Sequence, residues 1–312
     1  MKNFTRPVFR GILNHCYQRT EEGVVIFYSM SDYLVFFTHF CVFARRHDVQ
    51  VLSLCLMPDH IHHSTRAWDR EALAGFVRDY SSHFSRVHNQ TCRYGKRLFE
   101  SPFGSAPKTG DKKARTNLIY VGNNPVERHL CTAAEKYRWN FIAYARKPNP
   151  FSAPLVIRRA SYHLRKAVRE VKDAAGHLKP LTYMQLQRIS APLSHDEREQ
   201  LTDFIISTYN VLDYHSAIRF FGNYDNMILA MHATTGSEYD LNEVHSGKTD
   251  ACYAKLSTII MKKVGLNDIH DVFLLSERER YNLLLRLMGH TEATPEQLAA
   301  FLRVAPPRRR EI

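Results

Sequence analysis

The apolar run DVQVLSLCLMPDHIHH, residues 48–63, restricts the possible folds of this chain more than any other segment does. Its Val and Leu residues predict a strand that carries three histidines at its far end. Segments with helical spacing of apolar residues lie on either side of it. One begins at Ser31, a residue suited to cap a helix N-terminus, and the other covers residues 69–88. Strands and helices therefore alternate in this part of the chain.

Three further elements complete the first half of the chain. Residues 8–17 show partial alternation of polarity and predict a strand, and residues 97–104 predict another short strand. A helix begins near Asp111 and should stop before Pro125, because the residue preceding a proline disfavours the α region. The order strand–helix–strand–helix–strand–helix predicts an α+β domain with its helices against one sheet.

The Pro-rich segment ARKPNPFSAP, residues 145–154, predicts a domain boundary. We therefore expect one domain at residues 1–150 and a helical C-terminal region at residues 151–312. The last two helices, within residues 276–304, have the spacing of a helix-turn-helix pair. Three helix starts in this region have capping-box sequences, at Ser194, Ser276 and Thr294.

Positive charge is concentrated in the first part of the chain, and the net charge of the whole is +12. The net charge is +10 over residues 1–150, +6 over residues 151–192 and −4 over residues 193–312. This imbalance favours a polyanionic partner such as nucleic acid for the first half, although a basic solvated surface would give the same numbers.

The sequence favours a cytoplasmic protein without a membrane partner. The N-terminal MKNFTRPVFRG has no apolar signal-peptide core, and the longest apolar run, residues 33–44, is too short to span a bilayer. The six cysteines form no C-x-x-C pair. We therefore expect reduced, mostly buried thiols.

The motif MPDHIHH, residues 57–63, raises the question of a metal site. On a strand His60 and His62 share one face, and His63 points to the other. Two imidazoles on one face can chelate a divalent ion. The chain has 17 histidines, however, and one such pair arises readily by chance. The pair therefore needs a third ligand before it indicates a site.

Residues 117–127, NLIYVGNNPVE, offer partners for the histidine pair. On a helix Tyr120 and Asn124 lie one turn apart on the same face. Asn124 has a carbonyl oxygen that a metal ion can bind, and Tyr120 has a phenol that acts as a covalent nucleophile when it is activated. Asn124 could equally cap the helix ahead of Pro125, and Tyr120 could be a core aromatic residue.

Taken together, these motifs resemble those of the REP-associated tyrosine transposases, bacterial single-tyrosine transposases of the HUH superfamily. The resemblance extends from residue 8 to about residue 145. It rests on NHCYQRTEEGVVIF, MPDHIHH, LIYVGNNPVE and AEKYRWNFIAY in this order. The chain departs from the family at Asp59, where Asn is usual, and at His63, where an aliphatic residue is commoner.

The resemblance implies a ferredoxin-like antiparallel sheet with helices on one face, the HUH nuclease fold. It also implies that His60, His62 and Asn124 bind Mg²⁺ or Mn²⁺ and that Tyr120 is the nucleophile. The implied reaction is metal-dependent nicking and rejoining of single-stranded or hairpin DNA through a 5′-phosphotyrosine, which is the chemistry of DNA transposition and recombination. Relatives build the site within one chain or across a homodimer, and the residues leave both arrangements open.

Two other functions use the same features. A replication initiator or relaxase would have the same site, but such enzymes often carry paired tyrosines or a helicase module, and neither is evident. A non-catalytic DNA-binding regulator would keep the fold and use the C-terminal helix pair. In each case, basic residues on either side of the Tyr120 helix are candidates for contacts with the DNA backbone. They are Arg93, Lys96, Arg97, Lys108, Lys112, Lys113 and Arg115.

Overall fold

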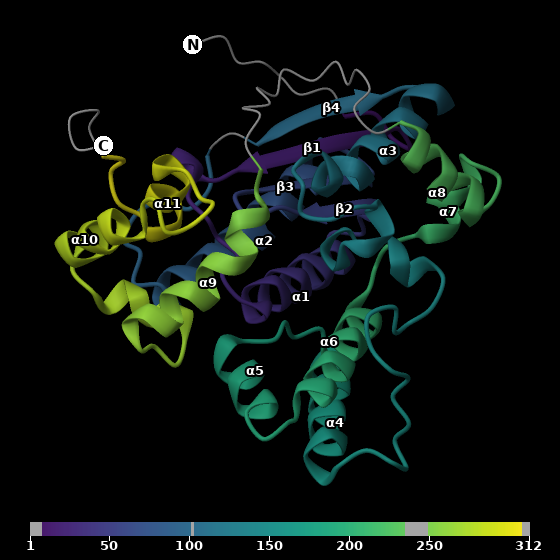
Figure 1. The fold of residues 1–312 in the computed structure, drawn as a ribbon. Coiled ribbons are helices and arrows are strands. Elements are labelled where there is room, and N and C mark those ends of the chain that lie inside the picture. Colours follow the sequence, from purple (N-terminus) through teal and green to yellow (C-terminus); the bar gives the residue numbers. More distant parts are fainter. Residues whose placement is uncertain (1–7, 101–102, 235–248, 308–312) are drawn as a thin grey trace.

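The computed structural model describes residues 8–100, 103–234 and 249–307. Within these residues, one antiparallel sheet has the strand order β2-β3-β1-β4 (Figure 1). Helix α1 (Met30–Arg46) connects β1 to β2, and α2 (Arg70–Thr91) connects β3 to β4. This β-α-β-β-α-β connectivity is ferredoxin-like, and the α+β class is confirmed. The strands are β1 (Leu13–Arg19), β2 (Gln50–Leu56), β3 (His60–Arg66) and β4 (Gly104–Lys108).

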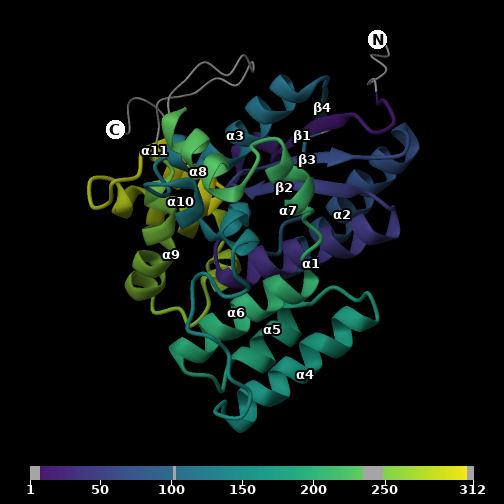
Figure 2. The same ribbon diagram turned by 90° about the vertical axis from the view of Figure 1, so that its right-hand side faces the viewer.

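Helices cover both faces of the sheet, so the prediction of helices on one face is wrong. On one face, Phe40 of α1 and Phe76 of α2 contact the ring of His63. On the other, Leu118 of α3 (Asp111–Glu127) packs in one cluster with Leu13 of β1. Figure 2 shows α3 and α1 on either side of the strands. The physical reason is that six of the seven residues of β3 are buried, and a strand buried on both faces needs cover on both.

The run 48–63 forms a hairpin rather than the single strand that its composition predicts. Strand β2 ends at Leu56, and β3 begins at His60. Pro58 lies between them and has no N–H to donate, so it interrupts the ladder. The backbone N–H of Met57 donates to the carbonyl of His60 over 2.9 Å and closes the turn. The histidines therefore begin β3 instead of ending β2.

Strands β1 and β4 are displaced from their predicted positions. Strand β1 runs to Arg19 instead of ending at residue 17, because its last residues pair with the start of β3. Strand β4 begins at Gly104, where we expect the last strand to end. A Cβ at residue 104 would lie 2.0 Å from Tyr17 Cε1. Glycine permits this close approach of the backbone to the Tyr17 ring.

Helix α3 continues through Pro125 to Glu127, so the prediction that it stops before the proline is wrong. Proline removes one backbone donor, and in the last turn that loss affects a single hydrogen bond. The preceding residue, Asn124, is 2% exposed and is hydrogen-bonded to the side chains of His62 and Tyr120. These tertiary contacts hold Asn124 in the helix against its local preference.

Capping residues set the starts of the other helices. The capping boxes predicted at Ser194, Ser276 and Thr294 are confirmed. Helix α1 begins at Met30, however, and its cap is Ser29 instead of Ser31. The reason is Asp32, whose carboxylate accepts hydrogen bonds from the backbone N–H groups of Tyr28 and Ser29.

Beyond α3 the described chain is helical, as the sequence predicts. Helix α6 packs against α1 and α4, α8 packs against α3, and α10 packs against α11. One apolar cluster includes Phe37 of α1 and Ile206 of α6, so the core continues past residue 150. The division into domains at residue 150 stays a prediction. The helices are α4 (Tyr162–Gly176), α5 (Tyr183–Ser190), α6 (His195–Tyr209), α7 (Tyr214–Arg219), α8 (Tyr224–Ala233), α9 (Ala251–Val264), α10 (Glu277–Leu287) and α11 (Pro295–Leu302).

A buried carboxylate joins three distant parts of the chain. Asp32 is fully buried, accepts a hydrogen bond of 2.6 Å from the Tyr183 phenol of α5, and lies 2.9 Å from His270 Nε2. On its other side, His270 Nδ1 lies 2.7 Å from Asp268. Burial lowers the pKa of His270, but the charge of Asp32 and the hydrogen bonds to both carboxylates outweigh it and raise the pKa to about 10. His270 is therefore a cation at neutral pH.

Two features bear on the environment of the protein. In the described part of the chain, no helix is both long enough and apolar enough to cross a membrane. All six cysteines lie in this part, none forms a disulfide, and five of them are buried.

We expect the Asp32–His270 pair to make stability depend on pH. The pKa of His270 is raised from 6.5 to about 10 on folding, so its contribution is fully present below about pH 6.5 and is lost as the pH rises through about 10. The substitution His270→Gln should cost roughly 3 kcal/mol near neutral pH, because it leaves the Asp32 charge buried without its cation. Urea unfolding near neutral pH and above about pH 10 measures the difference. An equal cost under both conditions would contradict this assignment.

Candidate functional site

The alternation of β3 separates its adjacent histidines. His63 lies on the α1 and α2 face, where its Nε2 is 3.4 Å from the phenol of Tyr80. Burial lowers the pKa of His63 to about 3, so this imidazole is neutral. His60 and His62 lie on the α3 face, with ring centroids 4.9 Å apart. The structure therefore brings together the histidine pair that alternation predicts and makes His63 a core residue.

His62 is the centre of a buried polar cluster between the sheet and α3. Its Nδ1 lies 3.1 Å from Nε2 of His15 on β1, and the two rings stack with centroids 5.3 Å apart. Its Nε2 accepts a hydrogen bond of 3.2 Å from the Asn124 amide nitrogen. An amide nitrogen can only donate, so a neutral His62 has its proton on Nδ1, which donates to His15.

The charge state of His62 agrees with this tautomer. Burial is the largest cause that lowers the pKa of His62 well below its ordinary value, and electrostatic interactions with His60, His63, Arg19 and Arg128 lower it further. The imidazole is therefore neutral at pH 7, and the lone pair of its Nε2 accepts the hydrogen bond from Asn124. A neutral imidazole whose second nitrogen is held by a hydrogen bond is the form that binds metal ions.

Tyr120 and Asn124 lie one turn apart on α3 and face this cluster. The Asn124 amide donates to the Tyr120 phenol oxygen over 3.3 Å, and the Tyr120 ring meets the His62 ring edge-on with centroids 5.4 Å apart. The predicted contact between segments about sixty residues apart is present, and one chain alone provides it. Tyr120 is 1% exposed, so its phenol lies inside the protein.

His60 connects the cluster to the C-terminal helices. Its Nδ1 is bonded to the carboxylate of Asp59. Burial raises the pKa of Asp59, but the charge and hydrogen bond of His60 outweigh burial, and the pKa lies below its ordinary value. Asp250, at the start of α9, has a pKa raised to about 6 by burial and by the nearby charge of Asp59. Arg128 lies 3.8 Å from Asp250.

The donor set on the α3 face consists of two imidazoles and one amide. Across the described residues, no group of three or more His, Cys, Asp and Glu side chains is arranged to hold a metal ion. A site here would therefore need the carbonyl oxygen of Asn124. That oxygen is buried and has no hydrogen-bond partner within the described chain. A buried acceptor without a partner costs free energy, and a cation ligand role would offset this cost.

The predicted basic residues lie in two groups toward opposite ends of β1. Lys108 of β4 pairs with Leu13 at the start of β1, and the exposed Lys112, Lys113 and Arg115 follow on α3. Burial and the charge of Lys113 lower the pKa of Lys108. The exposed Arg93, Lys96 and Arg97 come after α2, near Glu100, whose N–H donates to Arg19 at the end of β1. Only the first group adjoins the helix of Tyr120.

Sequence reasoning did not identify His15 or Asp250 as members of this site. His15 reaches His62 because Tyr17 pairs with His62 in the β1–β3 register. Asp250 reaches the site because its N–H donates to the carbonyl of Arg128 over 2.9 Å. Neither relationship produces a local spacing in the sequence, and the alternation of polarity along β1 is the one signal that bears on His15.

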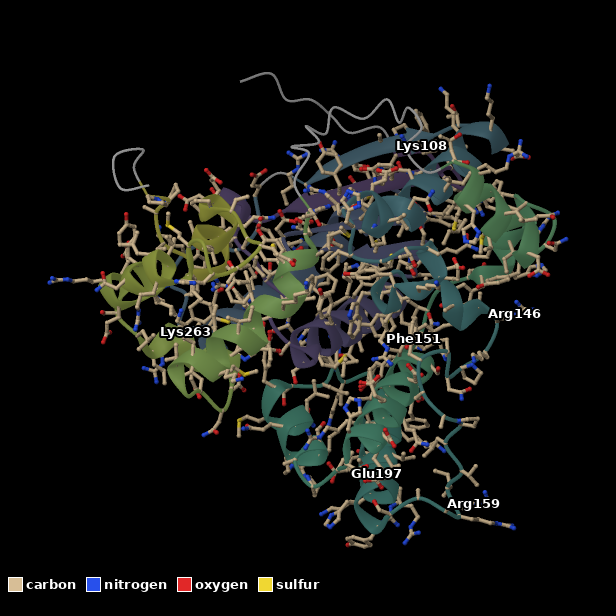
Figure 3. All side chains as sticks on the ribbon, viewed as in Figure 1. Lys108, Arg146, Phe151, Arg159, Glu197 and Lys263 are labelled. Atoms are coloured by element: carbon tan, nitrogen blue, oxygen red, sulfur yellow. The ribbon has the colours of Figure 1, made fainter. Side chains whose placement is uncertain are left out.

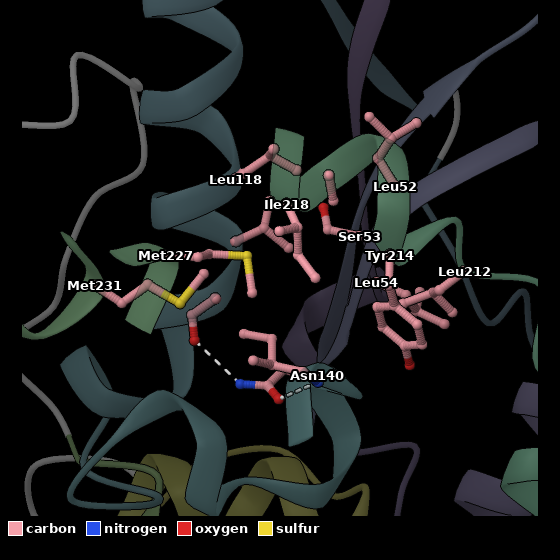
Figure 4. A pocket seen from close by; sticks show the side chains of 14 residues that line it. Leu52, Ser53, Leu54, Leu118, Asn140, Leu212, Tyr214, Ile218, Met227 and Met231 are labelled. Carbon is pink, nitrogen blue, oxygen red and sulfur yellow. Dashed lines mark hydrogen bonds between the residues drawn. The ribbon is translucent and has the colours of Figure 1, made fainter. Parts of the chain in front are cut away.

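Two buried amides hold helix α3 in position beside an apolar cavity, and Figure 4 shows one of them, Asn140, among the side chains that line the cavity. Leu118, Gly122 and Met231 are among the residues that line the cavity, which lies away from the histidine cluster. The Asn140 amide donates to the carbonyl of Gly122 over 3.2 Å, and the Asn123 amide donates to the carbonyl of Met231 over 2.8 Å. These contacts fix the turn of α3 that contains Tyr120 and Asn124.

The fold and site thus define an α+β protein with a buried His–Asn–Tyr cluster between a sheet and a helix. No family model matches this chain, and no curated protein matches it. Among solved structures, it is similar to the one described as "Structure of the REP associates tyrosine transposase bound to a REP hairpin". The two share 13% identity with a TM-score of 0.41, over 46% of this chain and 85% of that chain. A similarity with this identity and TM-score carries no information about the activity or ligands of this chain.

We expect Gly122 to be required for the close packing of α3 on α8. A Cβ at residue 122 would lie 2.7 Å from Met231 Cε and 2.9 Å from Ile142 Cδ1. The substitution Gly122→Val should therefore destabilise the protein by about 1–3 kcal/mol through overpacking. Adding Met231→Ala should recover part of this loss, since it removes the side chain in contact. A double-mutant cycle by urea unfolding measures the coupling, and strictly additive effects would show that residue 122 does not press on Met231.

Proposed function

We propose that this chain is a metal-dependent DNA nuclease and strand transferase of the HUH type, which nicks and rejoins single-stranded or hairpin DNA. The observation that carries the proposal is the hydrogen-bonded sequence His62–Asn124–Tyr120. Two motifs that are unrelated in sequence position meet in one buried cluster, and they supply a neutral imidazole, an amide oxygen and a phenol. This combination serves metal-assisted phosphoryl transfer with a covalent tyrosine intermediate.

In this proposal His60, His62 and Asn124 hold Mg²⁺ or Mn²⁺, and the imidazole ligands favour Mn²⁺. The bound ion supplies charge stabilisation and orientation of one DNA phosphate. His15 accepts the Nδ1 proton of His62 and so keeps the Nε2 lone pair directed toward Asn124. Asp59 performs the corresponding task for His60 by accepting its Nδ1 proton.

Tyr120 is the proposed nucleophile. Its phenol oxygen would form a bond to phosphorus while the bond to the 3′ oxygen breaks, and the phenol proton would be released as the departing 3′ oxygen takes one up. The product is a 5′-phosphotyrosine and a free 3′-OH. Attack of a second 3′-OH on this phosphotyrosine rejoins the strand without ATP, because the energy of the phosphodiester is retained in the phosphotyrosine. The rigid turn around Gly122 orients the phenol.

One observation favours a second candidate, a non-catalytic DNA-binding regulator. Tyr120 is 1% exposed and Asn124 is 2% exposed. A DNA phosphate reaches the phenol only after the groups around it move, whereas a regulator could keep the same cluster as part of its core. Formation of a covalent adduct distinguishes the two functions.

We expect Tyr120→Phe to fold and to bind DNA but to form no covalent adduct. Phenylalanine keeps the ring that packs against His15 and His62 and removes the attacking oxygen. Incubation with a panel of hairpin oligonucleotides and Mn²⁺, followed by denaturing electrophoresis and peptide mass spectrometry, detects the adduct. Tyr94→Phe, which changes a half-buried tyrosine elsewhere, is the matched control and should behave as the wild type. A phosphotyrosine on any other residue would refute the assignment, and an adduct-free wild type would favour the regulator.

We expect Asn124→Ala to raise the Mn²⁺ concentration needed for half-maximal cleavage by roughly 10-fold or more, because it removes a proposed ligand and even the loss of a group that only supports a ligand weakens metal binding by this factor. The double substitution His60→Ala/His62→Ala should abolish both cleavage and Mn²⁺ binding by calorimetry. DNA affinity should change little in either variant, because phosphate contacts come from Lys and Arg. An unchanged Mn²⁺ titration for Asn124→Ala would make this residue a structural part of α3 only.

A further inference from the structure

Six basic side chains gather on α4 and the loop that precedes it, far along the chain from the candidate site. All six are exposed, and in Figure 3 the side chain of Arg159 extends away from the body of the protein. We call this surface the α4 basic face. It consists of Arg158, Arg159, Arg165, Lys166, Arg169 and Lys172.

Helix periodicity separates this face from the core. Leu164, Val168 and Val171 are buried and pack toward α5 and α6. Arg165, Arg169 and Lys172 occur at spacings of four and three residues, so they form one exposed row beside the buried side. Lys172 Nζ lies at the edge of this row, 5.9 Å over the Phe204 ring of α6. At 1.5 Å per residue the row is roughly 10 Å long. It therefore presents a line of cations to solvent.

These cations are not neutralised by the protein. Among the residues that the structure describes, none of the six forms an ion pair. The two acidic residues of α4 have other partners, since Glu170 is bonded to Arg188 at 2.7 Å and Asp173 lies 3.4 Å from His177. Neighbouring like charges on a helix repel one another. A cluster of this kind is consistent with a polyanionic partner that relieves the repulsion.

We propose that the α4 basic face binds the phosphates of double-stranded DNA as a second surface, separate from the candidate site. The choice of DNA as the polyanion rests on the proposed function. The two surfaces lie on opposite sides of the sheet, because α4 packs on α6, α6 packs on α1, and α1 covers the face opposite to α3. A duplex bound at α4 is therefore a different segment of DNA from the strand beside Tyr120.

The shape and composition of the face favour a duplex over a single strand. Single-strand binders combine a groove with stacked aromatic side chains. The α4 basic face is the convex outer side of a helix, and the exposed aromatic residue within it is Tyr162. Its exposed cations can reach phosphates, although Arg165 also donates to the carbonyl of Ala160 over 2.8 Å. It therefore contributes affinity without sequence preference.

The test compares two triple variants with equal changes of charge. Arg165→Gln/Arg169→Gln/Lys172→Gln removes the row, and the control Lys262→Gln/Lys263→Gln/Arg278→Gln removes three exposed cations from α9 and α10. Affinity for a blunt DNA duplex is measured by fluorescence anisotropy over a range of salt concentrations. If all three side chains contact phosphates, the negative slope of log affinity against log salt should become shallower by about 2.7 in this variant. Between 50 and 200 mM salt, the variant should therefore lose roughly 40-fold less affinity than the wild type. The control should retain the wild-type slope.

Other outcomes separate this inference from the proposed function. Equal slopes for both triple variants, or loss of binding to anionic phosphatidylserine vesicles with duplex binding unchanged, would overturn it. A further variant, Arg158→Gln/Arg159→Gln, changes two residues of the loop before α4 and leaves the sequence of the helix unchanged. It should therefore make the salt dependence of duplex binding shallower even if the helical triple variant is unstable. The α4 variants should still form the Tyr120 adduct on a short hairpin oligonucleotide. A wild type with no adduct but with the slope difference would refute the proposed chemistry and leave the α4 basic face intact.

Discussion

Burial of β3 on both faces is the constraint from which the rest of this structure follows. Because side chains alternate along a strand, His62 must face α3 when His63 faces α1 and α2. A shift of one residue in register would exchange them and would place His62 among the phenylalanines of the core. Pairing with Tyr17 of β1 and Cys55 of β2 fixes the register. Backbone hydrogen bonds therefore decide which face of the sheet His62 occupies, and the packing of α3 on that face then brings Asn124 to it.

Local patterns were enough to predict some of this, and long-range packing explains what they missed. Alternation separates His62 from His63, and helical spacing places Tyr120 and Asn124 on one face, because both rules act within a few residues. The capping boxes at Ser194, Ser276 and Thr294 are local in the same way. The helix through Pro125 depends on contacts to the sheet, and the position of His15 depends on strand register. Cover on both faces of the sheet, likewise, is a property of the assembled layers.

The C-terminal helices pack against the segment that contains Val25 and Tyr28 and form an apolar cluster with it. Arg303, which ends α11 with a positive φ of 55°, donates to the carbonyl of Val25 and lies 4.4 Å over the ring of Tyr94. Five of the eight residues of α11 are buried. Such a helix retains little surface for the groove of DNA, and the net charge of −4 over residues 193–312 points the same way. If the protein holds DNA away from the candidate site, α4 is the better supported surface.

Tyr120 is buried within a cluster of side chains that are already hydrogen-bonded to one another. The cluster is already assembled, with His62 neutral, its tautomer fixed by His15, and Asn124 linking it to the phenol. His62, Tyr120 and Asn124 are all at most 2% exposed, and burial strengthens electrostatic interactions between such groups. In the proposed function, a DNA phosphate has to reach a phenol that is 1% exposed. The charged groups nearest to this cluster, Asp59, Arg128 and Asp250, lie on the side of His60.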